Sequence, residues 1–112
     1  MEKTSTRIIH KKGDFMIKHI VMWTIKDNDD KLKNMEQMKM LLENLKNKID
    51  IAFSLEVGIN EVQSPGACDI VLNSEFESLE DLNKYATHPS HMEVVEFIKS
   101  VCETRHAVDY SL

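Results

Sequence analysis

The side chains best suited to chemistry are concentrated between residues 85 and 91. This segment reads Tyr-Ala-Thr-His-Pro-Ser-His, so it holds a phenol and two imidazoles in a chain with only five histidines and two tyrosines. Pro89 forces His88 out of the helical conformation, and Tyr85 and His88 share one face of the preceding helix. Ser90 is expected to cap the helix that His91 begins. The three rings are therefore predicted to meet at a corner between two helices.

His91 is the candidate base. The positive end of a helix dipole disfavours an imidazolium, so this ring should be neutral and able to accept a proton near pH 7. Together with Tyr85 as hydrogen-bond donor to a developing enolate oxygen, it suits proton abstraction next to a carbonyl group. His19 lies between Ile17 and Val21 on an apolar strand face, either as a polar anchor for the ligand or as a satisfied core histidine. We expect no cofactor.

Two other interpretations of these residues remain open. One places His19, His88, His91 and Asp69 around a divalent metal, with suitable ligand types but without a dense spacing motif. The other is a non-catalytic structural or stress-related dimer, in which Tyr85 and the histidines satisfy each other beneath the helix corner. A ligand-sized pocket between helices and sheet would favour an enzyme.

Hydrophobic periodicity predicts the elements that must position these side chains. Residues 16–26 alternate with a period of two, which indicates a strand. Asn28-Asp29-Asp30 is a turn and helix-cap cluster, and apolar residues at 32–49 then recur at helical steps. Residues 51–59 and 68–76 alternate again and predict a hairpin with a long loop.

The second half of the chain continues this mixed pattern. Two capping boxes, at Ser78 and Ser90, precede short helices expected at 79–85 and 94–101. Alternation at 104–112 predicts a fourth strand. The order β-α-β-β-α-α-β indicates an α+β, ferredoxin-like fold: a four-stranded antiparallel sheet with its helices on one face.

The sheet face without helices is not expected to be polar. Ile20 and Met22 lie on the side of the first strand opposite Val21, and Val71 takes the same side of the third strand. An uncovered apolar face indicates a partner surface, so we expect a homodimer.

Composition excludes several classes of protein. The 112 residues suffice for one domain, and a net charge of −5 without a basic stripe argues against nucleic-acid binding. Apolar runs of about four residues are far shorter than the roughly 20 of a membrane span, and no signal-like segment opens the chain, so a cytoplasmic location is expected. Cys68 and Cys102 are expected as buried thiols.

Residues 1–15 differ from the remainder of the chain. They carry a net charge of +2, whereas residues 16–112 carry −7. The codons for residues 11–15 can form a purine-rich ribosome-binding sequence, so this stretch is interpreted as a mis-assigned extension before a start at Met16. A disordered N-terminal arm is the alternative. The domain is expected at 16–112.

Several short motifs resemble the stress-responsive A/B barrel (Dabb) family. The resemblance extends from Met16 to Tyr110 and implies a dimeric α/β barrel built from ferredoxin-like subunits. The matching motifs are Met16–Val21, Val57–Asn60, Asp69–Leu72, Phe76–Ser78, the Tyr-x-x-His-Pro-x-His pattern at 85–91, and Asp109-Tyr110.

The resemblance also implies a set of site residues. A plant member of this family cyclises a linear polyketide in an aldol-type reaction, using a Tyr and a His that match Tyr85 and His91 by position. His19 matches a histidine of its cavity, whereas Asp69 stands where that enzyme has a histidine. We therefore expect a pocket for a small carbonyl-containing ligand, with Tyr85 and His91 as catalytic residues. The expected ligand contacts are His19, His88, Asp69 and Trp23.

Overall fold

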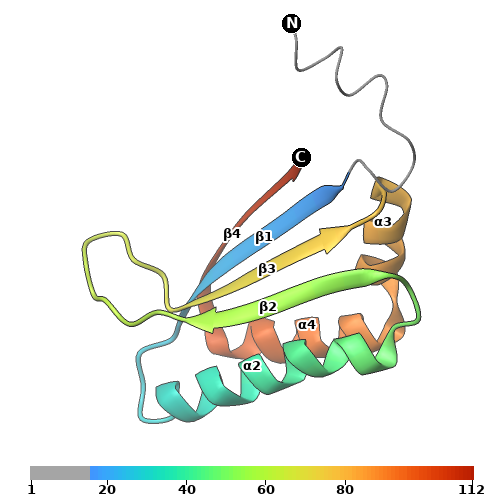
Figure 1. The fold of residues 1–112 in the computed structure, drawn as a ribbon. Coiled ribbons are helices and arrows are strands. Elements are labelled where there is room, and N and C mark those ends of the chain that lie inside the picture. Colours follow the sequence, from blue (N-terminus) through green and yellow to red (C-terminus); the bar gives the residue numbers. More distant parts are fainter. Residues whose placement is uncertain (1–15) are drawn as a thin grey trace, which may run out of the picture.

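The computed structural model describes residues 16–112, so the predicted extension at 1–15 lies outside the described residues. The expected order of elements is confirmed (Figure 1). The elements are β1 (Ile17–Ile25), α2 (Lys31–Lys48), β2 (Phe53–Ile59), β3 (Ile70–Phe76), α3 (Leu79–Thr87), α4 (Pro89–Val101) and β4 (Cys102–Ser111).

The strands form one antiparallel sheet in the order β2-β3-β1-β4. Figure 1 shows α2 and α4 covering the same face of this sheet. Val21 on β1 lies opposite Leu72 on β3 and Ala107 on β4, so these three side chains point to the same face. The ferredoxin-like α+β prediction is confirmed.

Helix α2 covers the sheet through one apolar face. Met38, Leu42 and Leu45 are buried at three- and four-residue steps, as the period of a half-buried helix requires. Its predicted cap has a different geometry. Asp30 is the N-cap without a side-chain capping bond, and Asn28 Oδ1 instead accepts from the Asp30 amide at 2.9 Å.

The corner between α3 and α4 is set by two different caps. Ser78 Oγ accepts from the Asp81 amide at 3.0 Å, which confirms the first predicted cap. The predicted cap at Ser90 is wrong, because α4 begins at Pro89 and His88 Nδ1 accepts from the Ser90 amide at 3.0 Å. Proline suits the first helical position, since its φ is helical and its missing N–H has no partner there anyway. The cap therefore moves back to His88.

Strand β4 begins at Cys102, two residues before the predicted start. Ile25 pairs with Cys102 but Thr24 pairs with Thr104, so Glu103 is an extra residue where the register shifts. A bulge breaks the period-two alternation, so the pattern becomes regular only beyond it.

The open face of the sheet carries apolar side chains, as predicted. Met22 is 40% exposed, Val108 52% and Tyr110 43%, while Ile20 and Val71 are half-buried. In the chain from residue 16 onward, no helix combines the length and the apolar character needed to cross a membrane.

Candidate functional site

A cavity of about 390 Å³ lies between β1, the end of α3 and the length of α4. This volume is within the range of small-molecule sites. Its lining combines aliphatic side chains with aromatic and nitrogen-bearing ones. The lining residues are His19, Val21, Trp23, Leu42, Leu72, Tyr85, Ala86, His91, Val95, Ile98, Lys99 and Arg105.

Tyr85 is held in this cavity by aromatic packing. Its ring centroid lies 5.2 Å from that of Phe53 and 5.1 Å from that of Phe76, and these two phenylalanines stack on each other. Tyr85 is fully buried, yet its Oη has no hydrogen-bond partner within residues 16–112. Burial raises the pKa of this phenol, so the group is a protonated donor.

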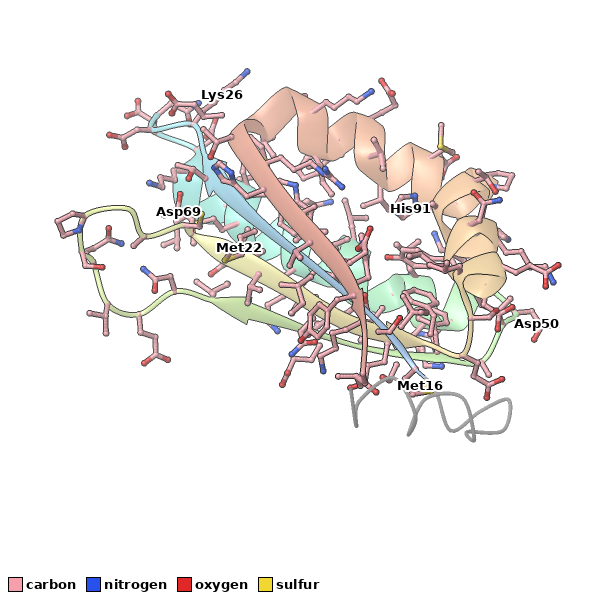
Figure 2. All side chains as sticks on the ribbon, turned by 90° about the horizontal axis from the view of Figure 1, so that it is seen from above. Met16, Met22, Lys26, Asp50, Asp69 and His91 are labelled. Atoms are coloured by element: carbon pink, nitrogen blue, oxygen red, sulfur yellow. The ribbon has the colours of Figure 1, made fainter. Side chains whose placement is uncertain are left out.

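His91 projects from the first turn of α4, and Figure 2 shows it between that helix and the sheet. Its ring centroid is 4.6 Å from that of Tyr85. Nδ1 lies 2.9 Å from the Ala86 carbonyl oxygen. A carbonyl oxygen only accepts, so Nδ1 carries the proton and Nε2 keeps its lone pair. Nε2 makes no hydrogen bond within the described chain.

The surroundings of His91 favour its neutral form. Burial is the largest cause and lowers the pKa of the imidazole, the bond to Ala86 opposes this effect, and the nearby Arg105 guanidinium lowers the pKa further. A neutral His91 was expected from the helix dipole. The structure assigns the main effect to desolvation instead.

His19 approaches the same cavity from β1. Its Nδ1 is hydrogen-bonded to a carboxylate oxygen of Asp109, the residue directly opposite it on β4. A carboxylate oxygen only accepts, so Nδ1 of His19 is the donor of this bond. Sequence reasoning missed Asp109 as a site residue. The register of β1 against β4 would have identified it.

Trp23 and Arg105 form the next pair along these strands. They lie directly opposite each other, and both line the cavity. Trp23 is 4% exposed, and its Nε1 has no hydrogen-bond partner within residues 16–112. Arg105 was also missed by sequence reasoning, because its position gives no signal until β4 is paired.

The structure places the two remaining candidates outside the cavity. The Asp69 carboxylate accepts from the Ile25 amide at 2.8 Å and lies 3.5 Å from Lys31 Nζ, so it fastens the end of β1. Figure 2 shows Asp69 near the Lys26 end of the sheet, away from His91. His88 caps α4. The cavity thus gathers Tyr85, His91, His19 and Trp23 but neither Asp69 nor His88.

The metal alternative finds no ligand set in the described part of the chain. Among residues 16–112, no three His, Cys, Asp or Glu side chains are grouped so that they could hold one ion. Cys68 and Cys102 are half-buried free thiols, and burial raises the pKa of Cys102 to about 11.

Comparison with known proteins assigns the chain to a family. The model of the Stress responsive A/B Barrel Domain (Dabb) matches residues 17–112. A stress-response A/B barrel domain-containing protein of Arabidopsis thaliana is 36% identical over 98 residues, which cover 85% of this chain. The chain corresponds to only 36% of the length of that relative.

Solved structures share the fold. A dimeric protein of unknown function with a ferredoxin-like fold from Bacteroides fragilis is 38% identical, with a TM-score of 0.76 over 87% of this chain and 96% of that one. The hydroxynitrile lyase of Passiflora edulis is 20% identical, with a TM-score of 0.75 over 87% of this chain and 93% of the lyase, a likeness of fold alone. With its family model matched from residue 17 to residue 112, this chain belongs to the stress-responsive A/B barrel (Dabb) domain family.

Proposed function

We propose that this protein binds a small carbonyl compound in the cavity and removes a proton from the carbon next to the carbonyl group. One observation carries the proposal. Tyr85, whose buried Oη is a donor without a partner in residues 16–112, lines the same cavity as His91, whose Nε2 is free to accept a proton. A carbonyl oxygen beside Tyr85 would satisfy the phenol and place its neighbouring carbon near the base.

The chemistry requires only these two groups. His91 Nε2 takes the proton, the C–H electron pair forms a carbon–carbon double bond, and the carbonyl electron pair moves to the oxygen. Tyr85 donates a hydrogen bond to the resulting enolate oxygen. In a ligand with a second carbonyl group, the enolate carbon attacks that carbonyl carbon, and the new alkoxide takes the proton back from His91. This sequence is an aldol-type ring closure without net redox change.

The structural alternative requires Tyr85 and the histidines to satisfy each other. The contacts of the described residues do not fit this arrangement, because His91 bonds to the Ala86 carbonyl, His19 bonds to Asp109, and the Tyr85 hydroxyl is left without a partner. A buried hydroxyl without a partner destabilises the fold by roughly 1–3 kcal/mol, so a purely structural tyrosine would favour phenylalanine.

We propose further that the working form is a homodimer joined through the open faces of the two sheets. The exposed Met22, Val108 and Tyr110 side chains support this arrangement, since such a face tends to be buried against a partner. The related Bacteroides fragilis protein is described as dimeric.

Hydrogen exchange at carbon tests the proposed reaction directly. The protein is incubated in D₂O with 1-phenylbutan-1-one or other enolisable ketones, and loss of the α-proton signal is followed by NMR. The parent should exchange faster than buffer, and His91→Gln should slow the reaction by about 10²- to 10⁴-fold, the usual contribution of a general base. His106→Gln is the control, because His106 points away from the cavity-lining side of β4. Exchange no faster than in buffer for every ketone would contradict the proposal.

A further inference from the structure

The polar groups that line the cavity are all donors or nitrogen bases. Besides Tyr85 and the two histidines, the lining contains the Trp23 indole, the Lys99 ammonium and the Arg105 guanidinium, and it includes no aspartate or glutamate. Asp109 and Glu96 offset the charge near His19 and Lys99, so Arg105 is the lining cation without a carboxylate partner in residues 16–112. The overall charge of the chain is −5. The cavity is therefore a local exception to the charge of the protein and complements a negatively charged ligand.

Trp23 and Arg105 are the two lining groups that an anion would find without a competing partner in residues 16–112. Trp23 and Arg105 are cross-strand neighbours on the helix-covered side of β1 and β4. The buried indole Nε1 has no acceptor within residues 16–112. The exposed Arg105 guanidinium forms no ion pair or side-chain hydrogen bond with these residues either. Lys99, by contrast, already lies 3.9 Å from Glu96. The free donors are therefore a neutral N–H and a planar guanidinium fork, the geometry that carboxylates bind best.

Trp23 and Arg105 also line a second space, which Tyr85 and His91 do not line. A second cavity of about 210 Å³ adjoins the first and shares Trp23, Ile98, Lys99 and Arg105 with it, so this pair lies where the two spaces meet. Glu103 lines only the second space, at the point where the register of β4 shifts. The Tyr85 and His91 end of the main cavity does not reach this second space.

We infer that the ligand is an oxo carboxylate, whose ketone lies at Tyr85 and His91 and whose carboxylate is bound by Trp23 Nε1 and Arg105. This inference rests on the proposed function and specifies its substrate class. It explains why the cavity holds two donors without partners: each end of the ligand supplies the acceptor that one of them lacks. The aliphatic walls formed by Leu42, Leu72 and Val95 would contact the carbon chain or ring between the two ends.

A matched pair of probes tests the carboxylate. 4-Oxo-4-phenylbutanoate and 1-phenylbutan-1-one share the phenyl ketone and differ only in a carboxylate against a methyl group. Trp23 is the single tryptophan of the chain, so one indole N–H signal in a ¹H–¹⁵N spectrum reports on this subsite. The oxo acid should bind about tenfold more tightly or better, as expected for a charge-assisted contact, and should shift the indole signal downfield.

Arg105→Gln should remove this preference by lowering the affinity for the oxo acid about tenfold or more, to near that for the neutral ketone. Lys48→Gln, on the last turn of α2, removes the same charge outside both cavities and should leave the preference intact. Equal affinity for the two probes, with no effect of Arg105→Gln, would overturn the carboxylate subsite. The proposed binding of a ketone at Tyr85 and His91 would not be contradicted by that result. Failure of both probes to shift any signal of the cavity residues would overturn the subsite together with the proposed function.

Discussion

The Tyr85 hydroxyl lies fully buried against two phenylalanines, with no hydrogen-bond partner in the described chain. Ring burial stabilises this residue, whereas the desolvated hydroxyl destabilises it by roughly 1–3 kcal/mol. His91 differs in that one of its ring nitrogens is satisfied by Ala86 and the other is free. Each of the two side chains therefore has one polar atom without a hydrogen-bond partner in residues 16–112, Oη in Tyr85 and Nε2 in His91, and both residues line the same cavity.

Tyr85→Phe should raise the free energy of unfolding by about 1 kcal/mol, because the ring contacts remain and the unsatisfied hydroxyl is removed. The same change should slow α-proton exchange by about 10²- to 10³-fold, since the enolate loses its hydrogen-bond donor. Urea denaturation and NMR exchange measure the two effects. Tyr110→Phe removes the same hydroxyl from the open face of the sheet, away from the cavity, and is the control that should leave the exchange rate unchanged. A clear loss of stability in Tyr85→Phe would show that the hydroxyl has a structural partner.

The lowered pKa of His91 predicts a dependence on pH. The unfolded chain binds a proton on this group near the ordinary value of 6.5, and the folded chain binds it only at lower pH. Stability should therefore be complete above about pH 6.5 and should fall as the pH drops from there through the folded pKa. Exchange activity should fall in the same direction, because only neutral His91 is a base.

Melting temperatures between pH 5 and pH 8 test this linkage. The parent should lose more stability on acidification than His91→Gln, because the variant lacks the titrating group. Identical acid-side slopes for the two proteins would show that His91 is not desolvated in the folded state.

At the scale of elements, the site depends on a sharp junction between α3 and α4. His88 has φ −65° and ψ 137°, an extended conformation that ends one helix and caps the next. Pro89 enforces this conformation on the residue before it. The junction directs Tyr85 from the end of α3 and His91 from the start of α4 into one cavity. Capping at this junction therefore contributes to the geometry of the site.

His88→Ala should lower the free energy of unfolding by about 0.5–2 kcal/mol, because α4 loses the side chain that caps its first turn. Ser90→Ala is the matched control and should stay within about 0.5 kcal/mol, since its side chain makes no capping bond. Chemical denaturation of both variants measures the difference. A larger loss of stability in Ser90→Ala than in His88→Ala would show that Ser90 is the cap.

At the scale of the whole molecule, the sheet has two faces with different surroundings. One face packs against α2 and α4 and contains the core and the cavity. The other carries exposed apolar side chains on β1 and β4. The site lies on the helix-covered face, so a partner on the open face would leave its lining residues in place.

Val108→Asp should convert the dimer into a monomer at micromolar concentration, because it would bury an unpaired carboxylate in the proposed interface. Sedimentation velocity measures the change. Leu32→Asp introduces the same charge at an exposed leucine of α2 and should leave the dimer intact. A parent protein that sediments as a monomer at this concentration would contradict the proposed assembly.

The sequence by itself determined the features that depend on local periodicity. The strand and helix order, the Ser78 cap and the proximity of Tyr85 to His91 all follow from residues close in the chain, because side-chain direction repeats every two residues in a strand and every 3.6 in a helix. The motifs of the Dabb family also lie within these local segments. The starts of α4 and β4 were misplaced, because a proline at the first helical position and a bulge at Glu103 interrupt the simple patterns.

Only the tertiary structure decided which distant residues share the cavity. Arg105 lines the cavity, and Asp109 bonds to the lining residue His19. Both come from the last strand, and their pairing with Trp23 and His19 depends on the register of β4 against β1. A shift of one residue would turn these side chains to the other face. The pairing of β3 with β1 places Asp69 at the end of β1, outside the cavity lining. Register depends on the packing of the whole sheet against its helices, and no local pattern contains that information.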